Sequence, residues 1–543
     1  MSILSFEFLG FGVLLLLAYY TLPVKWRPWV LLAFSIAFSA FSGWAGLAHL
    51  TVVALVAWGG ARGLCNLYRG QKDMDACAAK LARSSPMDWA REGDWQTPLQ
   101  AESMLKKSAR GYGTMRKWLL ALLLILDLGS MVFIKFYPAV AQWLNSGWAR
   151  KSPLPVWEMA APLGLSYFTF QSAGYLIDVA RGKAEAPKNP LRTLLFVGYF
   201  PQLPQGPISA WKNLESQLFA GHRLDPICFV SGFQLMVWGY FKKMVIADRL
   251  ALITAEALKL KTSLTGWLAL GSAVLYAVRL YADFSGGMDV VRGLSRMVGV
   301  NLPENFRRPF FSASVAEYWR RWHITLGAWF RSYLFYPLTV SRFGTGLGRA
   351  AGRILGKKNG QRLPLALGTI LVFLLIGIWH GFSLNAVIYG LYFGVIMALS
   401  LLLEPLWKLL NRRLKLPSFI MKPFRLIRTW VLITLPQFFA FTPGPDKAWF
   451  MLEKVFGDWS FDSFASRCVH IMEPREWIIL GSSVLILLVV DVICEKKNDF
   501  CDAVARGPFP IRWLLLMILI MAVLVFGCYG TGFDSAAFLY TQF

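Results

Sequence analysis

The chain has 543 residues, of which 56% are hydrophobic and only 16% are charged, and its formal net charge is +25. A soluble protein of this size could not bury so much apolar surface, so the composition excludes a soluble enzyme and predicts an all-α, polytopic membrane protein. The many Trp, Phe and Tyr residues are typical of membrane interfaces.

Apolar runs of about 17 to 20 residues are long enough to cross a membrane as helices. The first run is apolar from Ser2 and is expected to remain as a span. Two other apolar stretches, 190–211 and 286–340, are interrupted by Pro, Gly and Arg, so we predict re-entrant or interfacial segments there. The predicted spans are 3–20, 29–42, 44–61, 117–135, 159–179, 226–247, 262–281, 363–380, 384–403, 427–443, 476–494 and 512–530.

Lys and Arg gather in the segments between these runs, and this placement explains the net charge without a nucleic-acid partner. Stretch 341–362 has six basic residues and no acidic one. Because basic loops remain in the cytoplasm, we expect an inner (plasma) membrane protein with both termini extracytoplasmic.

The same pattern divides the chain into four parts. We predict N-terminal transmembrane helices over 1–61, a cytoplasmic loop or helical hairpin inserted over 62–116, a catalytic core over 117–403, and C-terminal transmembrane helices over 404–543. Within the last part, an external and partly helical segment is expected near 444–475.

Two of the five histidines lie in unusual surroundings. His380 ends the run LALGTILVFLLIGIWHG, and a titratable ring at membrane depth is by default a candidate functional group. A core histidine bonded to a backbone carbonyl is an equally good interpretation from these features alone. His323 lies in AEYWRRWHITLGAWFRSYLFYPL, where aromatic residues alternate with arginines.

That second segment has two interpretations. An amphipathic helix at the cytoplasmic interface would direct Arg320 and Arg321 toward lipid headgroups, and periodicity alone favours it. Alternatively, these arginines line a pocket for an anionic donor such as phosphopantetheine or CoA.

Further polar residues interrupt the apolar runs nearby. Arg279 and Asp283 are spaced to pair along a helix, and the cluster around them indicates either a water-filled cavity wall or structural ion pairs. The segment YFPQLPQGPISAW, which contains Gln205, cannot be a regular helix and could line a tunnel.

Several catalytic signatures are missing from the sequence. It has no phosphate-binding glycine loop, no HExxH and no GxSxG. No carboxylate or thiol near His323 and His380 completes a set of metal ligands, so we predict no metal and no permanently bound cofactor.

Three segments carry a resemblance to a known family: PENFRRPFF (303–311), EYWRRWHITLGAWFRSYLFYPL (317–338) and GIWHG (377–381). They resemble the signature of the membrane-bound O-acyltransferases, the MBOAT family. YFPQLPQGPI and YADFSGGMD are similar to its bacterial branch, which includes the alginate O-acetyltransferase AlgI and the D-alanyl transfer protein DltB. The resemblance runs from about Pro162 to Tyr392.

The resemblance implies a fold of about eleven transmembrane helices with re-entrant segments around a central tunnel. It also implies that His380 is the catalytic histidine and that His323 is the second functional position. Ser332 departs from the acidic residue that many relatives have after the arginine. We add the following candidates for substrate or donor binding: Arg307, Arg308, Arg320, Arg321, Trp322, Trp379, Asp283 and Gln205.

The expected reaction is attack of a hydroxyl on an acyl thioester, with neutral His380 as the base. The donor would be acetyl-CoA or an acyl carrier thioester, and the product an O-acetylated exopolysaccharide or cell-wall polymer. The resemblance implies an extracytoplasmic SGNH-type acyltransferase partner and a polysaccharide synthase complex, within membrane lipid. The alternatives are D-alanyl transfer to teichoic acid, a polysaccharide or lipid transporter without acyl chemistry, and a scaffold that recruits a synthase.

Overall fold

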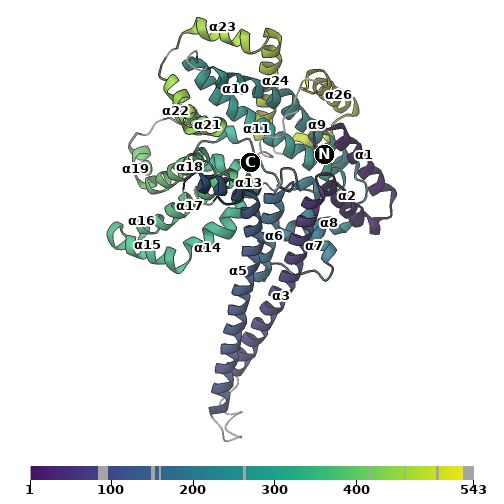
Figure 1. The fold of residues 1–543 in the computed structure, drawn as a ribbon, viewed down its shortest axis with the longest axis vertical. Helices are drawn as coiled ribbons and strands as arrows, with labels where there is room; N and C mark the ends of the chain where they lie inside the picture. The colour runs from purple at the N-terminus through teal and green to yellow at the C-terminus, as the bar shows by residue number, and fades with distance from the viewer. Residues whose placement is uncertain are drawn as a thin grey trace. The chain divides into compact units, whose positions relative to one another are not determined.

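The computed structural model describes residues 2–83, 96–147, 153–157, 161–260, 264–414, 417–457, 459–496 and 500–529. All regular structure in these ranges is helical, which confirms the all-α prediction (Figure 1). The chain forms two compact units, one of Ala18–Gly221 and one of Met1–Leu17 with His222–Phe543. The middle of the predicted insertion, 84–95, and the last residues, 530–543, lie outside the described ranges.

In the Ala18–Gly221 unit, two long helices lie side by side (Figure 1). The predicted spans 44–61 and 117–135 are only parts of them, because a helix continues through charged residues that water or headgroups can solvate. The described parts of 62–116 belong to these same two helices. The helices of the unit are α2 (Arg27–Phe41), α3 (Trp44–Arg83), α5 (Gln96–Ser146), α6 (Leu165–Ala180), α7 (Pro190–Gly198) and α8 (Trp211–Ala220).

The predicted break near 190–211 is present in this unit. α7 begins at Pro190, which follows the capping residue Asn189, and the next α-helix begins only at Trp211. Between them the Gln202 amide donates hydrogen bonds of 2.6 Å to the Pro207 carbonyl and to Ser209 Oγ. A side-chain amide thus satisfies a backbone carbonyl that a helix would otherwise pair.

The larger unit begins with α1 (Phe6–Thr21), whose last residues belong to the other unit, and contains most of the remaining helices. Its first half has α9 (Pro226–Tyr240), the π-helical segment η3 (Phe241–Ala247), α10 (Asp248–Lys259), α11 (Gly266–Met297), α12 (Val315–Arg321), α13 (Ile324–Phe330), the π-helical η5 (Arg331–Phe335) and α14 (Tyr336–Thr339). Its second half has α15 (Arg342–Leu355), α16 (Lys357–Gly360), α17 (Arg362–His380), α18 (Leu384–Leu402), α19 (Glu404–Leu414), α20 (Ser418–Thr434), α21 (Gln437–Phe441), α22 (Pro445–Lys454), α23 (Phe461–Ile471), α24 (Pro474–Lys496), α25 (Phe500–Ala505) and α26 (Phe509–Phe526).

Helices α17 and α18 form a tight antiparallel pair (Figure 1). A Cβ atom added at Gly377 would lie 2.4 Å from the Ala386 carbonyl oxygen and 3.0 Å from Gly390 Cα. Glycine is therefore required for the two backbones to approach so closely. α18 begins at the capping residue Ser383, whose hydroxyl accepts the Ala386 N–H at 3.2 Å. This pairing fixes the end of α17, where His380 lies.

Six helical segments in the described ranges are long and apolar enough to cross a membrane. The protein is therefore a multi-pass membrane protein, while the count of about eleven helices and the central tunnel stay predictions. Predicted span 226–247 is divided between the short helix α9 and η3, and span 427–443 is interrupted at Pro436. The six segments are Trp44–Lys80, Ala101–Ser146, Lys357–His380, Leu384–Leu402, Pro474–Lys496 and Phe509–Phe526.

Candidate active site

The two predicted histidines both adjoin one indole, that of Trp379. The Trp379 ring centroid is 4.6 Å from that of His380 and 6.3 Å from that of His323. His380 ends α17, whereas His323 precedes α13, so the fold brings together residues that are distant in sequence. Trp379, a predicted binding residue, is itself buried. Two imidazoles that adjoin one indole are the central feature of the candidate site.

His323 has a left-handed backbone, with φ +44°, and directly precedes α13. For a residue other than glycine this conformation costs on the order of 1–2 kcal/mol. The strain is balanced locally, because the Ile324 N–H donates to the Asn305 carbonyl at 3.0 Å. Strained backbone of this kind is concentrated at functional sites.

The Asn305 side chain sets the tautomer of His323. Asn305 Oδ1 accepts hydrogen bonds from the Thr325 N–H at 3.0 Å and from the Thr325 hydroxyl at 2.9 Å, which identifies this atom as the oxygen. The same oxygen lies 3.2 Å from His323 Nδ1. Since a carbonyl oxygen can only accept, Nδ1 carries the proton, and the lone pair of the neutral ring is on Nε2.

The surroundings of His323 favour its neutral form. The side chain is only 2% exposed and lies outside the six candidate spans. Burial, and to a smaller extent the nearby His380, lower the pKa of His323 well below its ordinary range. His323 is therefore neutral near pH 7.

Aromatic rings enclose His323 and its neighbours. The Phe284 ring meets the His323 ring edge-to-face at 4.9 Å. Trp322, another predicted binding residue, is buried, stacks on Tyr318 at 5.6 Å and meets Phe306 edge-to-face at 4.9 Å. Trp322 thus belongs to the wall that fixes the position of His323.

His380 is more accessible than His323. Its side chain is only half-buried, and the chain leaves α17 at the extended residue Gly381. A Cβ atom at Gly381 would have no atom within 4 Å. There is consequently open space at the residue that follows His380.

The four predicted donor-binding arginines fall into two pairs. Arg308 and Arg321 are both held by Glu495 of α24 at 2.9 Å, and Arg321 also pairs with Glu317 at 2.7 Å. Arg307 and Arg320, in contrast, are exposed. Of the four, Arg307 and Arg320 are thus the more accessible pair.

Asp283 is part of a buried ion cluster. Its carboxylate lies 2.6 Å from Lys243 Nζ, which also contacts Asp248 at 2.8 Å. The side chain of Arg279, which the spacing offered as the partner of Asp283, instead donates to Thr254 Oγ1 at 2.9 Å. The π-helical segment η3 accounts for the difference, because it presents Lys243 to α11.

Gln205 belongs to the other compact unit and is fully buried. Neither polar atom of its side chain has a hydrogen-bond partner among the described residues. In the part of the chain that the structure describes, no group of three or more His, Cys, Asp or Glu side chains could hold a metal ion.

Sequence reasoning missed Asn305 and Glu495 as supporting residues. Asn305 stands in the PENFRRPFF segment, and its position close to the candidate residues Arg307 and Arg308 was a usable signal. Glu495 is a single acid at the end of an apolar span, and nothing local in the sequence indicates its distant partners.

No family model matches the chain. It is 33% identical over 313 residues to the probable alginate O-acetylase AlgI of Azotobacter vinelandii. The matched region covers 57% of this chain and 56% of that protein. The chain is thus similar to bacterial proteins that are named alginate O-acetylase AlgI.

Two other proteins that the chain resembles are named for different polymers. The peptidoglycan O-acetyltransferase of Helicobacter pylori is 30% identical, covering 52% of this chain and 55% of the relative. The teichoic acid D-alanyltransferase of Bacillus subtilis is 29% identical, and the matched region covers 43% of this chain and 58% of that relative. The chain spans about half the length of the curated relatives it matches.

Proposed function

We propose that the protein is a membrane-bound O-acyltransferase that passes an acetyl group from a cytoplasmic thioester across the membrane for O-acylation of an exopolysaccharide or cell-wall polymer. The observation that carries this proposal is the placement of His323 and His380 around Trp379. The names of the AlgI and peptidoglycan O-acetyltransferase relatives support the reaction class.

His380 is the base in this proposal. Its imidazole takes the proton of the acceptor hydroxyl as the oxygen attacks the thioester carbonyl carbon. The carbon–sulfur bond then breaks, and the imidazolium returns the proton to the leaving thiolate. Positioned base catalysis of this kind contributes roughly 10²–10⁴-fold to the rate.

His323 has a different task. Its proton is on Nδ1, toward Asn305, so its Nε2 is an acceptor that orients a hydroxyl or thiol hydrogen near Trp379. Because burial keeps this ring neutral, it does not compete with His380 for the transferred proton. We therefore assign His323 to positioning.

The donor in this proposal is acetyl-CoA or an acyl carrier thioester. Both carry phosphate groups, which the exposed Arg307 and Arg320 are free to approach from the cytoplasmic side. The proposal includes an inner-membrane location with both termini extracytoplasmic, following the basic loops. It also includes an SGNH-type extracytoplasmic partner and a polysaccharide synthase complex as recipients.

D-alanyl transfer to teichoic acid is the second candidate, favoured by the similarity to the Bacillus subtilis D-alanyltransferase. The donor distinguishes the two candidates. Purified protein should use acetyl-CoA in the first case, and only an aminoacylated carrier protein in the second.

An experiment in cells tests the alternative that the protein is a transporter or a scaffold without acyl chemistry. Polymer acylation is compared between wild-type cells and cells that express His380→Ala at the same level in the membrane. We expect the variant to lose acylation. Normal acylation in the variant would favour the transporter or scaffold, and in the scaffold case deletion of 62–116 would be the damaging change.

A further inference from the structure

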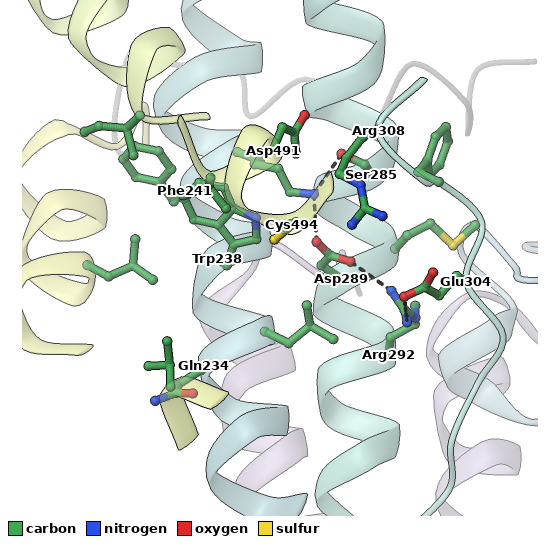
Figure 2. Close-up of a pocket in the computed structure, with 18 of the residues that line it drawn as sticks. Gln234, Trp238, Phe241, Ser285, Asp289, Arg292, Glu304, Arg308, Asp491 and Cys494 are labelled. Carbon is green, nitrogen blue, oxygen red and sulfur yellow. Dashed lines mark hydrogen bonds and ion pairs between the residues drawn. The ribbon is translucent and has the colours of Figure 1, made fainter. Parts of the chain in front are cut away.

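A pocket of about 470 Å³ lies in the larger unit, beside the candidate active site (Figure 2). It is lined by α9, η3, α11, the 304–308 segment, α24, α25 and α26. Neither His323 nor His380 is among its lining residues, but Asn305, which supports His323, is. The volume is in the range of ordinary small-ligand sites.

The charges around the pocket are balanced. The lining has four cationic and four acidic side chains: Lys242, Arg292, Arg296 and Arg308, and Asp289, Glu304, Asp491 and Asp502. A polyanionic ligand such as CoA would find no net positive charge here. Electrostatic complementarity therefore favours a ligand without net charge that has charged parts of both signs.

Three of the four lining carboxylates are already neutralised by arginine or lysine. Asp289 pairs with Lys242 at 2.7 Å and with Arg292 at 3.3 Å, and Arg292 also pairs with Glu304 at 3.3 Å (Figure 2). Asp502 pairs with Arg296 at 2.5 Å.

Asp491 is the exception. Its carboxylate accepts a hydrogen bond from the Tyr281 hydroxyl at 3.0 Å, but within the described ranges it has no cation within ion-pair distance. Lys242 and Arg308 act on this carboxylate only from beyond ion-pair distance, and each is paired directly with another acid, Asp289 and Glu495. A buried carboxylate without a directly paired cation is costly. It is the natural position for an ammonium group of a ligand.

Donors for an anionic group are also present. Arg292 and Arg296 are one helical turn apart on α11, and the Nε atom of each is buried with no hydrogen-bond partner among the described residues. Guanidinium N–H groups of this kind bind phosphate oxygens well.

The opposite side of the pocket is apolar. In Figure 2, Trp238 and Phe241 lie across from Ser285, Asp289, Arg292 and Arg308. α24 and α26 complete this side, and none of the α26 span is buried in the protein. The pocket thus joins a charged end to helices that face the membrane. The apolar residues from these two helices are Ile486, Val490, Leu515, Leu516, Ile518, Leu519 and Ala522.

We propose that this pocket binds a zwitterionic aminophospholipid, with its ammonium on Asp491, its phosphate on Arg292 and Arg296, and its acyl chains along α24 and α26. Such a lipid contacts Asn305 and thereby stabilises the loop that positions His323. A primary ammonium can donate hydrogen bonds to Asp491, so phosphatidylethanolamine should bind better than phosphatidylcholine.

The test measures lipid binding to the delipidated full chain in detergent by native mass spectrometry. Phosphatidylethanolamine, phosphatidylcholine and phosphatidylglycerol are titrated separately. We expect one phosphatidylethanolamine to bind about tenfold more tightly than phosphatidylglycerol, since one charge-assisted contact differs. Asp491→Asn should abolish this preference, whereas Asp446→Asn, an exposed acid on α22, should keep it.

A second variant keeps the proposal testable if Asp491→Asn does not fold. Ala522→Trp fills the apolar side without changing any charge and should lose all lipid binding at this site. The proposal is overturned if Asp491→Asn keeps the wild-type preference, if phosphatidylglycerol binds equally well, or if acetyl-CoA displaces the lipid. None of these outcomes depends on acyl transfer, so the proposed function can fail or survive separately.

Discussion

Asn305 Oδ1 lies 3.2 Å from His323 Nδ1 and also receives both hydrogen bonds of Thr325. One buried amide oxygen thus fixes the start of α13 and the tautomer of the histidine that precedes it. Because Asn305 is also part of the pocket lining, it connects the candidate active site with the proposed lipid site.

Replacing this amide should weaken catalysis through His323. In Asn305→Ala, the backbone N–H of Thr325 and His323 Nδ1 lose their acceptor, and each buried group left unpaired costs about 1–3 kcal/mol. We expect kcat for acyl transfer to fall about 10- to 100-fold with a smaller change in KM. Steady-state kinetics of the purified protein measures both, and an unchanged kcat would show that Asn305 does not position His323.

A charged replacement should change the pH dependence instead. In the wild type, burial and His380 lower the pKa of His323. The ring therefore stays neutral until the pH falls well below the ordinary pKa of a histidine. Asn305→Asp places a carboxylate beside Nδ1, which stabilises the imidazolium and raises the pKa of His323.

Rate profiles between pH 5 and pH 8 check this expectation. The acid limb of kcat/KM should move to higher pH in Asn305→Asp, since His323 then gains a proton under conditions where the wild type remains neutral. Asn305→Ala is the control, because it removes the amide without adding charge. Identical acid limbs in all three proteins would contradict the assigned role.

The sequence predicted the candidate site only in part. His323 and His380 could be singled out from their surroundings and from the family resemblance, and Trp379 adjoins one of them. The contacts that support them could not be predicted, because the left-handed backbone of His323, which places its ring beside Asn305, is indicated by no local pattern. Glu495 reaches Arg308 only through the packing of α24.

The close approach of α17 and α18 gives a test of how the site is held. In Gly377→Val, the new side chain meets the Ala386 carbonyl oxygen and the Gly390 backbone, so the helices must separate. We expect a lower melting temperature and loss of acyl transfer.

Gly271→Ala is the matched control for this variant, since a Cβ atom there has no neighbour within 4 Å. It should keep or slightly raise the melting temperature, because alanine is the better helix former. Thermal unfolding in detergent, followed by fluorescence, compares the two variants. Equal stability of Gly377→Val and the wild type would mean that the helix pair tolerates separation.

The buried cluster around Lys243 should be structural. Lys243→Met leaves the carboxylates of Asp283 and Asp248 without their shared cation, and breaking a buried ion pair in this way costs about 3–5 kcal/mol. Denaturant unfolding should show this loss of stability. Lys259→Met, which removes an exposed pair with Glu256, should change stability little. A stable Lys243→Met protein that lacks activity would instead assign the cluster to donor binding.

The extent of the helices was also only partly predictable. Hydropathy located the spans at 44–61 and 117–135, but α3 and α5 extend far beyond them, because hydropathy measures where a helix meets lipid and not where it ends. Hydropathy also did not indicate that residues 241–247 form a π-helix. Their sequence is apolar apart from Lys242 and Lys243, and the partners Asp289 and Asp283 lie on α11.

The most direct measurement of the central claim is single-turnover acyl transfer from a radiolabelled acetyl thioester by purified His380→Ala, with membrane insertion and melting temperature checked against the wild type. The account predicts a folded variant that binds the donor and transfers acetyl about 10²–10⁴-fold more slowly. A folded His380→Ala protein that transfers acetyl at the wild-type rate would contradict it.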